Sequence, residues 1–406
     1  MGSFNLSSLP CMENLFEDTS VDVSVEVGDA AEVAEETTEA AEVATDVQED
    51  TAEASDTETT TELLFQHIDT LINRKMYLET YGYDRRFAML AAQDGVDYIQ
   101  GGAPAVESVS DVSSANDSYT IAALEGVGDA LKSAWEWIKK VLGKIANWVG
   151  RFFRSVVMMF SSLENNIIRL KKLKNERSWN TESAEKASGD VPDDNLETAM
   201  SEAISKNNAD SGIVNSGNWG GVAADLKAAF SGVKIYATSS MATGEQDKPG
   251  TIGSVLQQGA NDYSDAVDKN KDFSKKQREA HKKIIEDLKK VADKKQSISN
   301  ATDKSVDTWL TLATKICKEK LAIRNLGDSA AKDVSVAKKQ AEKYSALDSN
   351  DGKISSAVTK KFRAITTLLS DLQSFSAKFC GALVKIANWL VKGAAKVLGA
   401  CYKKNK

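Results

Sequence analysis

The chain has 406 residues, with 51 Lys and Arg, 59 Asp and Glu, and a formal net charge of −8. Its four cysteines and two histidines show no CxxC spacing and no Cys–His proximity in sequence, so they offer little material for a zinc site or a Cys–His catalytic pair. A nucleotide-binding glycine loop and a GxSxG nucleophile elbow are also absent from the sequence, and we expect a protein that is not an enzyme and holds no cofactor or metal.

The charge of the chain changes sign at Ala123-Leu124-Glu125-Gly126. Residues 1–125 contain 27 acidic against four basic residues, a net charge of −23, whereas residues 126–406 contain 47 basic against 32 acidic residues, a net charge of +15. A cut at this seam would turn an acidic protein into a basic one and so change the partners that it attracts.

Residues 1–62 are predicted to be a disordered acidic tail. Between residues 21 and 62 the sequence is almost entirely Ala, Glu, Thr, Asp and Val, with a near-repeat of ten residues in 30–39 and 40–49. Like charges at this density, with few large apolar side chains, oppose compaction.

Residues 63–104 are predicted to form a small helical hairpin. Its first helix is indicated by apolar residues at helical spacing and its second by a shorter set, before a break at 101–104. Residues 105–125 follow as an exposed linker that ends at the seam. The apolar residues are Leu64, Phe65, Ile68, Leu71, Ile72 and Leu78 in the first helix, and Phe87, Leu90 and Ala91 in the second.

Two long amphipathic helices are predicted, one directly after the seam and one at the end of the chain. The first has an apolar stripe from Val127 to Phe160, and the second has one from Phe362 to Val397, each stepping by three or four residues. Both have basic residues beside the stripe. These are Lys132, Lys139, Lys140, Lys144, Arg151 and Arg154 in the first helix, and Lys385, Lys392 and Lys396 in the second.

Between the two lie six segments of ordinary helical periodicity, separated by clusters of Gly, Asn, Ser and Asp. With only four prolines and little alternation of β-branched residues, the fold is predicted to be all-α, an elongated multi-helix bundle over residues 126–406. The segments are 163–175, 195–205, 222–236, 273–298, 306–323 and 330–347.

The basic amphipathic helices admit three interpretations. Their Trp and Phe side chains can pack in a core while the lysines face water, the helices can lie on an anionic membrane surface, or the basic body can bind DNA phosphates without sequence preference. The first interpretation is compatible with either of the others. Residues 135, 137, 148, 152, 153 and 389 are the aromatic side chains concerned.

The order of acidic Ala/Glu tail, short hairpin, Ser/Asp linker, Ala123-Leu124-Glu125 followed by Gly126, and Trp/Lys helix resembles the internal head proteins of large tailed bacteriophages, over residues 60–160. In that family a prohead protease cuts after glutamate in short motifs of the type small-x-Glu. The resemblance implies a cleavage site at Glu125, with a secondary site at Ala105-Val106-Glu107.

The resemblance also implies a role and a place. The protein would be made in the bacterial cytoplasm, enter the prohead with other capsid core and inner head proteins, lose its acidic propeptide, and stay inside the capsid beside phage DNA. The resemblance also allows its ejection together with that DNA. The alternative that the sequence leaves open is a membrane-active protein that the acidic propeptide holds inactive.

Overall fold

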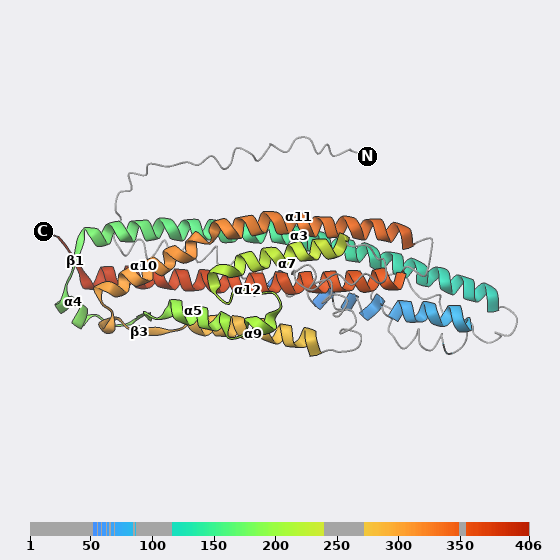
Figure 1. Cartoon of the computed structure of the whole chain (residues 1–406), viewed down its shortest axis with the longest axis horizontal. Coiled ribbons are helices and arrows are strands. Elements are labelled where there is room, and N and C mark those ends of the chain that lie inside the picture. The colour runs from blue at the N-terminus through green and yellow to red at the C-terminus, as the bar shows by residue number, and fades with distance from the viewer. Residues whose placement is uncertain are drawn as a thin grey trace, which may run out of the picture.

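The computed structural model describes residues 52–83 apart from 55, 58, 62, 65 and 69, residue 86, and residues 116–238, 272–348 and 355–405. This part of the chain is an elongated bundle of helices (Figure 1), and the all-α prediction is confirmed. The described helices after residue 115 are α3 (Asn116–Asn175), α4 (Thr181–Lys186), α5 (Leu196–Ser205), α6 (Asn208–Ser211), α7 (Val222–Thr238), α9 (Asp272–Ala292), α10 (Asp303–Lys318), α11 (Lys320–Asp348) and α12 (Ser355–Cys401).

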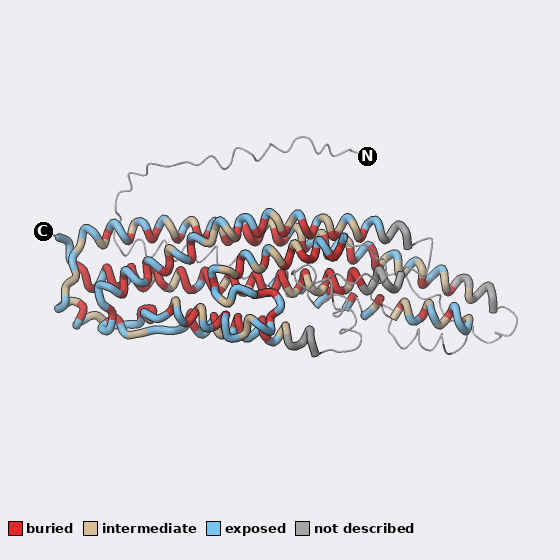
Figure 2. Tube along the Cα trace, in the orientation of Figure 1, coloured by how far each residue is buried: buried red, intermediate tan, exposed pale blue. Residues whose placement is uncertain are grey.

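Helix α12 lies at the centre of the bundle. It packs against α3, α7, α9 and α10, while α11 packs against α3 and α7. The buried residues accordingly run along the middle of the molecule, and the exposed ones lie on the outer faces of the surrounding helices (Figure 2). The prediction of long helices at the start and the end of the body is confirmed, since α3 has 60 residues and α12 has 47.

The two long helices run parallel, and a pair of short strands holds their ends together. Strand β1 (Arg177–Trp179), just after α3, pairs antiparallel with β4 (Tyr402–Lys404), just after α12. About forty residues earlier in each helix the rings of Trp135 and Phe362 meet at 5.5 Å. A second pair, β2 (Asp190–Pro192) with β3 (Lys295–Ser297), ties the segment after α4 to the segment after α9.

Some predicted boundaries are wrong. Residues 163–175 are the last part of α3 and not a separate helix, and α9 ends at Ala292, before a short strand that the sequence did not indicate. Helix α11 continues through residues 324–329, the interval that separates the predicted segments 306–323 and 330–347, and this interval includes Gly327. A β-carbon at Gly327 would lie 2.7 Å from Cβ of Phe153. The absence of a side chain at Gly327 therefore allows α11 to pack closely against α3.

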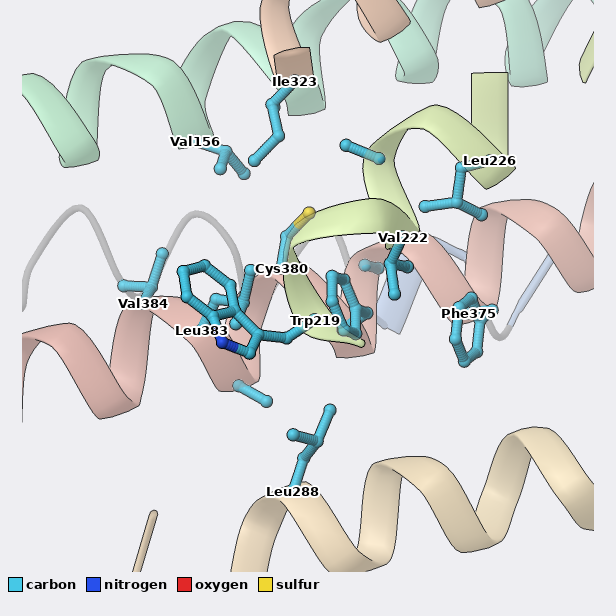
Figure 3. Close-up of a cluster of buried hydrophobic side chains, with 14 of the residues drawn as sticks. Val156, Trp219, Val222, Leu226, Leu288, Ile323, Phe375, Cys380, Leu383 and Val384 are labelled. Atoms are coloured by element: carbon cyan, nitrogen blue, oxygen red, sulfur yellow. The ribbon is translucent and has the colours of Figure 1, made fainter. Parts of the chain in front are cut away.

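Large apolar side chains from distant parts of the sequence fill the centre of the bundle (Figure 3). Trp219, on the 3-10 turn η3 (Trp219–Gly221), lies among Cys380 and Leu383 of α12, with Val156 of α3 above and Leu288 of α9 below. All five are buried. This cluster belongs to one continuous core that includes residues from α3 to α12.

Candidate functional site

The predicted cleavage motif lies inside a helix. Helix α3 begins at Asn116, so Ala123-Leu124-Glu125-Gly126 occupies its second and third turns, and the prediction of a linker up to Glu125 is wrong for residues 116–125. Ser, Asp and Asn were read as linker residues, but they also favour the beginnings of helices. Residues 105–115, including Ala105-Val106-Glu107, lie outside the described part.

The two ends of the motif differ in exposure. Glu125 and Gly126 are exposed, whereas Ala123 is only 2% exposed and Leu124 is half-buried. Ala123 and Val127 pack with Leu71, Leu78 and Tyr83 in a small cluster of their own. The motif is therefore accessible at the glutamate and held in a helix by its apolar side.

Residues on the N-terminal side of the seam form a helix that packs on the body. Every described residue between 52 and 81 is helical, and the helix ends at Gly82, whose positive φ of 72° permits its backbone N–H to bond to the Leu78 carbonyl oxygen at 2.9 Å. Tyr83 then donates its backbone N–H to Oγ1 of Thr120 at 2.9 Å. We call residues 52–81 the N-terminal helical segment.

This segment buries one face at spacings of three and four residues. Ala54, Leu64 and Ile68 belong to the main core of the bundle, and Oγ1 of Thr61 lies 3.4 Å from Oγ of Ser370 on α12. The prediction of a disordered tail up to residue 62 is therefore wrong for the described residues between 52 and 61; residues 1–51 lie outside the described part. The buried face consists of Ala54, Thr57, Thr61, Leu64, Ile68, Leu71, Arg74 and Leu78.

A line of basic residues follows the outer face of α3. Lys140, Lys144, Arg151 and Arg154, with Asn147 between them, are exposed and are spaced by four, three, four and three residues, which places them on one side of the helix. We call these five residues the basic face of α3. It spans about 21 Å at the α-helical rise of 1.5 Å per residue.

Two hollows open along this face. One, of about 530 Å³, is lined by Glu53, Lys144, Ala146, Asn147, Gly150, Arg151 and Arg154. The other, of about 440 Å³, is lined by Glu136, Lys139, Lys140, Gly143, Lys144, Asn147, Lys338 and Glu342. Lys144 and Asn147 line both, so the hollows adjoin. In the first, Nη2 of Arg151 donates to Oε2 of Glu53 at 2.7 Å.

The other predicted contact residues of α3 are paired within the helix. Lys132 lies 3.2 Å from Oδ1 of Asp129, and Lys139 forms an ion pair with Glu136. Lys140 lies over the ring of Trp137, with Nζ 5.5 Å from the ring centroid. The basic face is thus concentrated between residues 140 and 154.

The predicted contact lysines of α12 do not join this face. Lys385 forms an ion pair with Asp293 at 2.8 Å, and Lys396 donates to the carbonyl oxygen of Asp190 at 3.3 Å. Lys392 is half-buried. Because these partners lie after α9 and on β2, the α12 lysines help to fix those connections to the bundle.

The aromatic stripes lie in the core. Trp135, Trp148, Phe152 and Phe153 are buried, and the rings of Trp148 and Phe152 stack at 4.5 Å. Trp137 is the exception at 41% exposed. The packing interpretation of the stripes is confirmed, and the apolar faces that would insert into a membrane surface are covered by other helices. No helix in the described ranges has the length and apolar character needed to cross a bilayer.

The described residues include no group of three or more His, Cys, Asp or Glu side chains able to bind a metal ion. Cys317, Cys380 and Cys401 are buried and unpaired, and burial raises the thiol pKa of Cys317 and of Cys380 to about 12. Thiols with such values are protonated near neutral pH and are weak nucleophiles.

Comparison with known proteins gives one match. A family model of phiKZ-like phage internal head proteins matches residues 17–188, a range that includes the N-terminal helical segment, the seam, all of α3 and the basic face. Neither the curated proteins nor the solved structures contain a match. Over residues 17–188 the chain is therefore similar to the phiKZ-like phage internal head proteins.

Proposed function

We propose that this internal head protein is matured by cleavage after Glu125 and that its basic body then packs against phage DNA. The similarity of residues 17–188 to phiKZ-like phage internal head proteins supports a structural role inside the phage capsid. Cleavage and DNA contact are the steps that we add. They rest on the change in net charge from −8 for the whole chain to +15 for residues 126–406.

The observation that carries the proposal is the contact between the two oppositely charged parts. Glu53, in the acidic region, forms its ion pair with Arg151 on the basic face of α3. A propeptide that lies against the basic face reduces its attraction for DNA both by contact and by its field, which at 0.1 M salt extends over about 10 Å. Removal of residues 1–125 would remove both effects.

Mapping the N-terminus of the protein in purified virions tests the cleavage step. We expect the chain to begin at Gly126, because Glu125 and Gly126 are exposed at the charge seam. Abundant peptides from residues 1–120 in mature virions would contradict the proposal. Glu125→Gln should block this cut, and a cut after Glu107 should then replace it. The double variant Glu107→Gln with Glu125→Gln should keep the hairpin and much of the acidic tail attached to the body.

Binding to double-stranded DNA tests the second step. The cleaved form should bind DNA without sequence preference and more tightly than the full chain, with an affinity that falls steeply between about 50 and 200 mM salt because counterions are released. Binding to anionic vesicles that persists at high salt would favour membrane activity instead. Equal affinity of the full chain and the cleaved form for DNA at low salt would contradict inhibition by the propeptide.

A further inference from the structure

The hollow that contains Glu53 is lined mainly by side chains that attract anions. Among the described residues that line it, Lys144, Arg151 and Arg154 are cationic, Asn147 can donate from its side-chain amide, and Glu53 is the one carboxylate. Lys144 and Arg154 have no ion-pair partner within the described ranges, so Glu53 compensates only part of the charge gathered here. Gly150 also lines the hollow, and a β-carbon there would meet nothing within 4 Å.

Glu53 is positioned by its neighbours in the N-terminal helical segment. Ala54, the next residue, is completely buried in the main core. The backbone carbonyl oxygen of Glu53 accepts a hydrogen bond from Oγ1 of Thr57 at 2.7 Å, and Thr57 in turn accepts one from Oγ1 of Thr61 at 2.7 Å. The carboxylate is thus carried into the hollow by a helix that is anchored on the other side.

We propose that this hollow is a binding site for a phosphate group of the DNA backbone, and that Glu53 occupies it before maturation as an intramolecular substitute for that phosphate. The inference deepens the proposed function, on which it rests. A guanidinium group binds carboxylate and phosphate oxygens with the same donors and in the same planar geometry. The Nη2 to Oε2 contact of 2.7 Å between Arg151 and Glu53 shows those donors in use.

The shape of the surrounding surface favours a long polyanion over a single phosphate or a membrane. The basic face continues from this hollow to Lys140 in the adjoining one, so four cations lie in a line about 21 Å long. Between Lys144 and Arg154 this line contains Asn147, Gly150 and Arg151. A membrane-surface helix would need large apolar side chains all along those cations, whereas the exposed ones near this line, Trp137 beside Lys140 and Met158 one turn after Arg154, lie at its two ends.

The test uses the full chain and the variant Glu53→Gln, which keeps the size of the side chain and removes its charge. Affinity for a short labelled DNA duplex should rise about two- to five-fold at low salt, the range expected for one exposed ion pair, and the slope of log K against log salt should steepen by about one unit. Glu197→Gln is the matched control. Glu197 pairs with Lys315 at 2.8 Å and is 46% exposed, against 43% for Glu53, and its loss changes the net charge equally.

A double change separates the hollow from a general effect of charge. In the background of Arg151→Gln, Glu53→Gln should no longer change DNA affinity, because the guanidinium that both anions use is gone. Equal effects of Glu53→Gln and Glu197→Gln, or an effect that persists without Arg151, would overturn the proposal. Faster hydrogen exchange of residues 56–61 in Glu53→Gln would also overturn it, because the segment would then have left the bundle as a whole.

Two further arms distinguish this inference from the proposed function. In the first experiment anionic vesicles replace the DNA duplex. If Glu53→Gln increases vesicle binding without increasing DNA binding, the choice of DNA as the ligand is overturned. In the second experiment the DNA affinity of the cleaved form is measured beside that of the full chain. Absence of DNA binding by every form would remove the proposed function itself, whereas tight binding by the cleaved form with no effect of Glu53→Gln would remove the inference alone.

Discussion

At the scale of single residues, burial in the bundle changes the pKa of His281 on α9. Its ring lies 4.9 Å from that of Phe375, and its Nε2 lies 2.8 Å from the carbonyl oxygen of Ser211, so Nε2 carries the proton and donates it to that bond. Burial lowers the pKa of His281 to about 4, with a smaller contribution from the charge of Arg278. The histidine is therefore neutral in the folded protein near neutral pH.

The bundle should lose stability as the pH falls below about 6.5. An unfolded chain binds a proton at His281 near its ordinary pKa, whereas the folded chain resists protonation until about pH 4, so the free energy of unfolding decreases through this window by at most about 3 kcal/mol. Denaturant unfolding at pH 7, 6, 5 and 4 measures this. His281→Gln, which can still donate to Ser211, should flatten the curve, and an unchanged pH dependence would contradict the assignment.

Two helical glycines should respond in opposite directions to alanine. Gly327→Ala should lower the free energy of unfolding by about 1–3 kcal/mol, because its β-carbon would lie 2.7 Å from Cβ of Phe153 across the contact between α11 and α3. Gly150→Ala, with nothing within 4 Å, should raise it by about 0.5–1 kcal/mol through helix propensity alone. Thermal unfolding of both variants measures the difference, and a stabilising Gly327→Ala would show that α11 can move away.

At the scale of helices and strands, the sequence predicted the elements that have large apolar side chains. The spacing of Trp148, Phe152 and Phe160 in α3 predicts a buried stripe even when the helices that cover it are not known. The buried face of the N-terminal helical segment was only half visible, because Leu64, Ile68 and Leu71 signal burial whereas Ala54, Thr57 and Thr61 are too small or too polar to do so. Thr61, for example, is buried against Ser370 of α12, which lies 309 positions away in the sequence.

The sequence predicted the basic face of α3 but not the contacts that other parts of the chain make with the predicted basic residues. The spacing of Lys140, Lys144, Arg151 and Arg154 places them on one side of a helix from sequence alone. That Glu53 reaches Arg151 depends on tertiary packing over 98 positions, and the separation of the α12 lysines from this face depends on Asp293 and Asp190. The strand pairs, at three residues each, are too short for any periodicity to show.

Cleavage at Glu125 should depend on unwinding the start of α3. A protease binds its substrate extended, and the motif is helical with Ala123 buried, so the local stability of the first turns opposes cleavage. Gly128→Ala, where a β-carbon would meet nothing within 4 Å, should stabilise these turns and slow the cut by about three- to five-fold. The rate of appearance of the fragment beginning at Gly126 measures this.

Gly143→Ala is the control for that experiment. It also replaces a glycine of α3 by a better helix former, with only the end of the Lys338 side chain at 3.7 Å, but it lies about five turns after the seam. It should leave the cleavage rate unchanged. Equal slowing by both variants would show that the whole of α3, and not its first turns, must open before the protease can act.

At the scale of the whole molecule, the charge seam does not coincide with a boundary of the core. Ala54, Leu64 and Ile68 lie on the acidic side of the seam, yet they belong to the same continuous core as α3 and α12. The small cluster around Leu78 includes Ala123 before the seam and Val127 after it. The N-terminal helical segment is therefore both an electrostatic cover and a structural element of the bundle, and its loss has a cost in stability as well as an effect on charge.

The body of residues 126–406, produced without the rest, should consequently be less stable than the full chain. Leu64 and Ile68 alone bury side chains that contribute about 3–6 kcal/mol, and their removal uncovers apolar surface on α3 and α12. We expect a melting temperature lower by at least about 5 °C and stronger binding of a hydrophobic dye, both reversed when residues 52–125 are added as a separate peptide. Equal melting temperatures and dye binding for the two forms would show that the segment rests on a core already complete without it, and that maturation changes only the charge.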